Sequence, residues 1–112
     1  MKTDRELLEL AAKAAGLRFA INGDDLPGYV AVAGDDWRYG WTHWNPLTDD
    51  GDALRLAVKL NVMFDFIKSG FMSGNVVAVC EQRGAYEPRE PDPYAATRRA
   101  VTRAAAEIGS QS

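Results

Sequence analysis

The chain has 112 residues, of which 46% are hydrophobic and 26% charged, and its net charge at pH 7 is −3. This is the composition of an ordinary globular domain, and the slightly acidic balance gives no electrostatic reason to expect non-specific binding to nucleic acid. No apolar run approaches the roughly 18 residues of a membrane span, the N-terminus lacks an apolar signal core, and one cysteine excludes an internal disulfide. We therefore expect a single domain over residues 1–109 in a reducing cytoplasm, with residues 110–112 frayed.

The first predicted element is a helix over residues 3–15. Thr3 and Glu6 have the spacing of a capping box, in which each side chain satisfies a free backbone N–H of the first turn. Gly16 follows the last apolar position and is expected to end the helix. Two strands are predicted next, over residues 17–22 and 29–33, with turn residues between them.

An aromatic strand is predicted over residues 37–41, because Trp37, Tyr39 and Trp41 alternate with smaller or polar residues. Trp37 and Tyr39 stand at its loop end, where large rings stay partly exposed. They are our candidates for the residues that face a partner. Trp41 and Trp44 lie closer to the next helix and are expected in the core.

The segment 44–60, WNPLTDDGDALRLAVKL, organises the rest of the chain. Asn45-Pro46 predicts a turn, Thr48 a helix cap, and Leu54, Ala57, Val58 and Leu60 a helix face buried against a sheet. Asn61 suits the left-handed residue that ends such a helix.

Three carboxylates occupy the first turn of that helix: Asp49, Asp50 and Asp52. They complement the positive end of the helix dipole, and we prefer this interpretation to a divalent-cation site because the EF-hand spacing is absent. We expect neither a metal nor a cofactor.

The strands predicted over residues 62–67 and 75–81 are apolar at both parities, which is typical of strands covered on both faces. Residues 84–93 hold three prolines and alternating charges and are predicted to be a loop. Asp92-Pro93 then opens a last helix that Gly109 is expected to end. The fold class predicted is α+β: a three-layer α/β/α sandwich of four to five strands and three helices, in the order α-β-β-(β)-α-β-β-α.

The segment WNPLTDDGDALRLAVKL, the strand pair after it and the closing ATRRAVTRAAAEIG resemble small proteins of tailed phages and prophages, the phage ABA-sandwich family. The resemblance covers residues 44–109, and Asn61 stands where that family usually has glycine. It implies the three-layer sandwich and a phage origin. It implies no activity, because no catalytic residues come with the family.

Candidate catalytic groups are few. His43 and Cys80 are the residue types of a base and a nucleophile, but no feature of the sequence brings them together, and Cys80 lies in an apolar run typical of inert thiols. The chain has no glycine-rich phosphate loop, nucleophile elbow or HExxH motif. We therefore expect that the protein is not an enzyme.

The C-terminal helix is locally basic, with Arg98, Arg99 and Arg103. These arginines are candidate contacts for an anion or nucleic acid, although an ion pair between Arg103 and Glu107 on a solvated face is the commoner pattern. The function predicted is a non-catalytic phage or prophage accessory protein that binds a host or phage protein in the host cytoplasm, with its oligomeric state left open. The alternative is a small nucleotide- or nucleic-acid-binding module that uses the aromatic strand and the arginine helix.

Overall fold

A computed structural model describes residues 2–23, 26–33, 41–80 and 83–111. In this part of the chain there are three helices, α1 (Asp4–Ala15), α2 (Asp50–Leu60) and α3 (Pro93–Ser110). The strands are β1 (Leu17–Gly23), β2 (Leu26–Ala33), β3 (Thr42–His43), β4 (Met63–Phe66), β5 (Asn75–Cys80) and β6 (Arg83–Pro88). The α+β class predicted from the sequence is confirmed, but the described residues form six strands where four to five were predicted.

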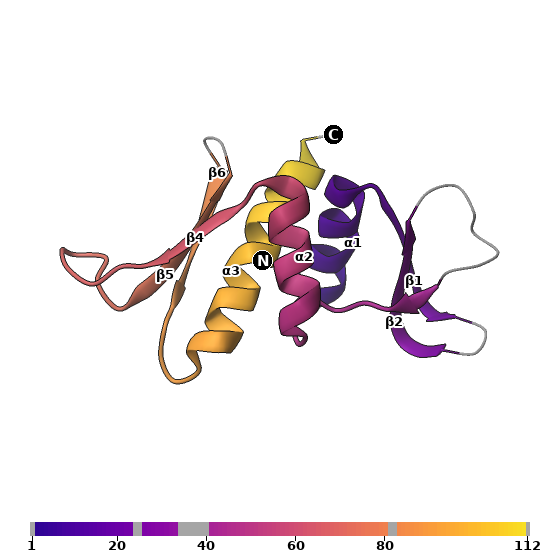
Figure 1. Ribbon diagram of the computed structural model, residues 1–112, viewed down its shortest axis with the longest axis horizontal. Helices are drawn as coiled ribbons and strands as arrows, with labels where there is room; N and C mark the ends of the chain where they lie inside the picture. Colours follow the sequence, from indigo (N-terminus) through magenta and orange to yellow (C-terminus); the bar gives the residue numbers. More distant parts are fainter. Residues whose placement is uncertain (1, 24–25, 34–40, 81–82, 112) are drawn as a thin grey trace.

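The strands form two antiparallel sheets, with orders β1-β2-β3 and β4-β5-β6. The helices lie between these sheets, and the molecule is elongated, with extents of 49 × 28 × 25 Å (Figure 1). On one side α1 packs on β1, and on the other α3 packs on β4, β5 and β6. The predicted layering was therefore wrong. The helices are the middle layer, and the two sheets are the outer ones.

Small residues make this central helical layer possible. Ala11 and Ala12 of α1 and Ala100, Ala104 and Ala105 of α3 are fully buried. Alanine lets two helix backbones approach closely, so α1 and α3 form the most extensive contact between helices in the described structure.

Gly109 belongs to the same contact. A Cβ atom at this position would overlap the backbone carbonyl oxygen of Leu10 in α1. The helix does not end at Gly109, as the sequence suggested, but continues to Ser110. Close packing against α1, and not helix termination, explains the glycine.

Most of the predicted helix ends are confirmed. Thr3 and Glu6 form the capping box, and the hydrogen bonds from Thr3 hold the pKa of Glu6 below its usual value. Gly16 and Asn61 end their helices in the left-handed conformation, and the Asp92 side chain caps α3. These signals depend only on neighbouring residues.

The buried face of α2 was predicted correctly only in part, because Ala57 is buried and Leu60 partly buried as expected but Leu54 and Val58 are not. This helix packs on α1 and α3 and buries Ala53, Leu56 and Ala57. Leu54 and Val58 instead face solvent, with 58% and 70% of their surface exposed. The sequence of α2 is apolar on more than one side, so the spacing of its apolar residues does not show which side faces the core.

The sheet β4-β5-β6 is covered on one face only. Val76, Ala78 and Cys80 of β5 are buried on the side of α3. On the other face Met63 and Val79 pair with each other and are 76% and 38% exposed. The expectation that β4 and β5 are covered on both faces was wrong.

The loop predicted over residues 84–93 was also wrong in its first part, which is strand β6. Pairing with β5 runs from Cys80↔Arg83 to Asn75↔Pro88. Glycine, alanine and proline have weak strand propensity, so the pairing comes from the neighbouring β5 and from packing on α3.

Candidate docking surface

The two residues predicted to face a partner, Trp37 and Tyr39, lie outside the described residues, and that prediction stays open. Trp44 is buried, and its ring lies edge-on to Phe19 with 6.1 Å between centroids. This confirms Trp44 as a core residue, whereas Trp41 is half-buried.

Arg98 joins two helices. Its guanidinium forms an ion pair with Asp50 at 2.7 Å and donates to the carbonyl oxygen of Leu47 at 3.0 Å. With most of its side chain buried, Arg98 ties α3 to the turn that precedes α2.

Arg99 and Arg103 converge on one carboxylate of β6. Arg99 contacts Glu87 at 3.3 Å and Asp4 at 3.0 Å, while Arg103 contacts Glu87 at 3.1 Å and the carbonyl oxygen of Tyr86 at 3.0 Å. Arg103 thus pairs across to β6, where the sequence suggested Glu107. Each of these charges already has an intramolecular acidic partner, which favours a structural role.

The carboxylates at the start of α2 also have partners within the molecule. Asp49 is the cap, in place of the predicted Thr48, and accepts from the Asp52 N–H at 2.8 Å. The buried Asp52 accepts from the Asn45 N–H at 3.0 Å and pairs with Arg55 at 2.7 Å. Asp50 holds Arg98, and among the described residues no group of three or more potential ligands is positioned to hold a metal ion.

The structure separates His43 from Cys80. His43 lies exposed on β3, and Cys80 lies buried on β5 in the sheet on the other side of the helices (Figure 1). The Cys80 thiol donates to the carbonyl oxygen of Leu60 at 3.1 Å. The two side chains do not form a dyad in this structure.

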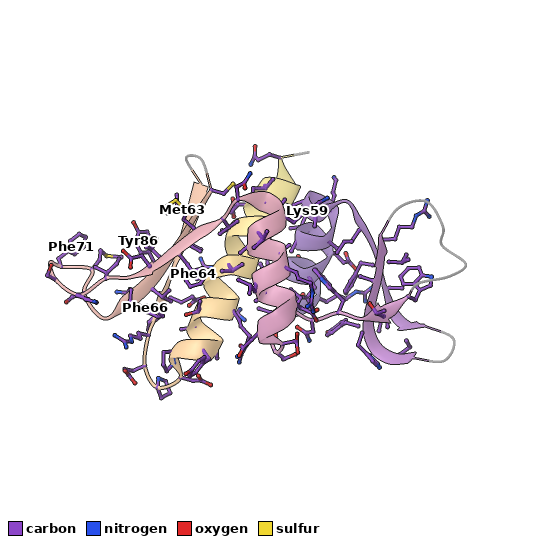
Figure 2. The ribbon with its side chains drawn as sticks, viewed as in Figure 1. Lys59, Met63, Phe64, Phe66, Phe71 and Tyr86 are labelled. Carbon is purple, nitrogen blue, oxygen red and sulfur yellow. The ribbon has the colours of Figure 1, made fainter. Side chains whose placement is uncertain are left out.

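An apolar groove lies between α2, β4 and the first half of α3. It has a volume of about 510 Å³, and it is lined mainly by apolar side chains, including Leu54, Phe64, Phe66, Tyr94 and Val101. Figure 2 shows Phe64 and Phe66 on the side of β4 that faces α3. The Arg89 guanidinium lies 4.9 Å from the centroid of the Phe66 ring, so a cation borders the groove.

Large side chains at the edge of this groove are left open to solvent. Leu54, Phe64 and Tyr94 are 58%, 44% and 70% exposed, and Val58 continues the line one turn along α2. We call Leu54, Val58, Phe64, Phe66 and Tyr94 the docking surface. Adjacent exposed apolar residues around a groove are the usual signature of a contact site.

An open sheet edge borders the docking surface. In the order β4-β5-β6, β4 has a neighbour on one side only. The Ile67 N–H donates to the Asn75 carbonyl oxygen at 2.9 Å, so by alternation Met63 and Asp65 turn their backbone groups toward β5. Phe64 therefore turns its N–H and C=O toward the open edge.

Comparison with known proteins does not add to this picture. No family model, no curated protein and no solved structure matches the chain. The resemblance to phage ABA-sandwich proteins therefore stays a prediction. In the described residues no helix is long and apolar enough to cross a membrane.

Sequence reasoning missed the docking surface because it placed Leu54 and Val58 in the core. One signal was available: Leu54 and Val58 are four residues apart, and so are Ala53 and Ala57, which gives α2 two neighbouring apolar stripes. When one of these two stripes is buried in the core, the other stays exposed to solvent.

Proposed function

We propose that this chain is a non-catalytic protein-binding module, and that its partner is a protein that covers the docking surface with apolar side chains. The observation that carries the proposal is the apolar groove with Leu54, Val58 and Tyr94 each more than half exposed beside it. Burial of apolar surface is the main favourable term in protein association, and exposed large side chains around a cleft are its usual source.

A role as an accessory protein of a phage or prophage, acting in the host cytoplasm, is part of the same proposal. Its support is the resemblance of residues 44–109 to phage ABA-sandwich proteins. The nucleic-acid alternative has less support, because Arg98, Arg99 and Arg103 are all paired with carboxylates.

The test is affinity capture by the tagged chain from a nuclease-treated bacterial lysate that also contains the untagged chain. We expect a captured protein that is lost with the double variant Leu54→Glu, Val58→Glu. Both side chains are exposed, so the variant should keep its fold by circular dichroism. A charge on this surface would have to be buried on binding, which weakens association strongly.

Phe71→Glu is the matched control. Phe71 is 96% exposed at the tip of the β4–β5 hairpin, away from the groove, so its replacement should leave capture unchanged. Capture that survives the double variant, or that disappears on nuclease treatment, would contradict the proposal.

A further inference from the structure

The open edge of β4 carries little of the protection that natural sheets use against pairing between molecules. Exposed edges are usually blocked by lysine, proline, a bulge or a covering element. The sequence of β4, MFDF, has one charged residue, Asp65, and no lysine or proline. The opposite edge strand, β6, ends in Pro88 and has Glu87 in ion pairs with α3. Of these two edges, β4 is the one suited to accept a strand.

Asp65 limits how another β4 strand can align with this edge. In an antiparallel pair about a twofold axis, centring on Asp65 would set two carboxylates directly opposite each other, which is destabilising. Centring on Phe64 instead places Asp65 opposite Met63 of the other copy. Phe64 and Phe66 both turn their backbone groups outward, but the Phe66 N–H already donates to the Asp65 carboxylate at 2.8 Å, so the Phe64 N–H is the donor left for a second strand. One register is thus favoured by both charge and hydrogen bonding.

The exposed stripe of α2 lies beside the same edge. Only Asn61 and Val62 separate α2 from β4, and Leu54 and Phe64 line one groove. A strand added next to β4 would turn alternate side chains toward the helical layer, over Leu54 and Val58. A twofold axis at Phe64 brings the α2 helices of two copies together in antiparallel orientation, so their exposed apolar stripes meet.

The charges on α2 are complementary under the same twofold axis. Asp49 and Asp50 stand at its N-terminal end and, although paired with Arg55 and Arg98, keep side chains 58% and 70% exposed, while Lys59 stands in its last turn. Antiparallel packing sets the acidic end of one helix toward the basic end of the other, and it also opposes their dipoles favourably.

We infer that the docking surface binds a second copy of this chain, through β4–β4 pairing centred on Phe64 and contact between the two α2 helices. The product is a continuous six-stranded sheet with a self-complementary, closed interface. This inference rests on the proposed function, since it names the occupant of that surface. Because β4 has four residues, the interface is at the small end of the range, and we expect a dimer that dissociates at micromolar concentration.

Analytical ultracentrifugation of the untagged chain, from low micromolar to near-millimolar concentration, is the direct test. We expect a reversible monomer–dimer equilibrium that the double variant Leu54→Glu, Val58→Glu shifts at least tenfold toward monomer. Tyr86→Glu is the matched control, because Tyr86 is 49% exposed on the face of the sheet that points away from α3. It should dimerise like the wild type.

Hydrogen exchange separates the proposed geometry from other dimers. Amides of residues 62–66 should exchange more slowly at high than at low protein concentration, because edge pairing protects the Phe64 N–H. The inference is overturned by a monomer at every concentration, by a dimer that Tyr86→Glu disrupts and the double variant does not, or by unchanged exchange in β4. If the chain is monomeric but the double variant still loses a captured foreign protein, the proposed function stands without this inference.

Discussion

The role of a single residue in this molecule is often set by a contact with a distant part of the chain, which the neighbouring sequence does not predict. Gly109 lies inside α3, where glycine is unfavourable for a helix, because the Leu10 carbonyl oxygen of α1 leaves no room for a side chain. Asp52, in turn, holds both Arg55 and the Asn45 N–H, and so fixes the turn that leads into α2.

Gly109→Ala should therefore destabilise the protein although alanine is the better helix former. The added methyl group must displace the α1 backbone, and overpacking of this kind typically costs about 1–3 kcal/mol. Chemical denaturation measures the change. Ser110→Ala, at the exposed next position, is the control and should stay within about 0.5 kcal/mol of the wild type. A Gly109→Ala protein as stable as the wild type would show that α1 and α3 are not in close contact here.

At the scale of elements, α2 separates core residues from surface residues that look alike in sequence. Leu56 is 3% exposed between the other helices, and Leu54, two positions away, is 58% exposed. Two leucines on one helix thus have different roles, one in stability and one on the docking surface.

Leu56→Ala should lower the free energy of unfolding by about 2–5 kcal/mol, as truncation of a buried leucine does. Leu54→Ala should change it by less than about 1 kcal/mol, because most of its side chain is already in water. Denaturation at low micromolar protein, where dimer is scarce, gives both values. The reverse order of the two effects would mean that α2 is rotated relative to the structure described above.

At the scale of the whole molecule, the two sheets share one helical layer. The buried cluster runs from Ala31 and Trp44 on one side, through Leu8 and Ala104 of the helices, to Val76 on the other. A core that is continuous across both sheets predicts that neither sheet unfolds alone.

Two probes in opposite halves can check this cooperativity. The three tryptophans fall between residues 37 and 44 of the sequence, and the two that the structure describes, Trp41 and Trp44, flank β3, whereas the buried Cys80 thiol lies in β5. Tryptophan fluorescence and thiol labelling should give the same denaturation midpoint. Separate midpoints would mean that the helical layer does not couple the sheets.

By itself, the sequence determined the local structure of this protein and its α+β class. Capping at Thr3 and Asp92 and the left-handed ends at Gly16 and Asn61 were predictable because each involves residues within a turn or two of the chain. The strands around Phe19 and Val76 were predictable because the alternation and apolar content of a strand are properties of the strand itself.

Only the tertiary structure decided the order of the layers, the strand β6, the outward face of α2 and, with it, the docking surface. Both parities of Val76–Val79 are apolar, which is compatible with either one or two covering layers, and the packing of α3 covers one. Leu54 and Leu56 are equally hydrophobic, and the neighbours α1 and α3 select the second for the core. Packing between segments that are distant in sequence determines which faces are buried, and the residue types within one segment do not specify where the other segments lie.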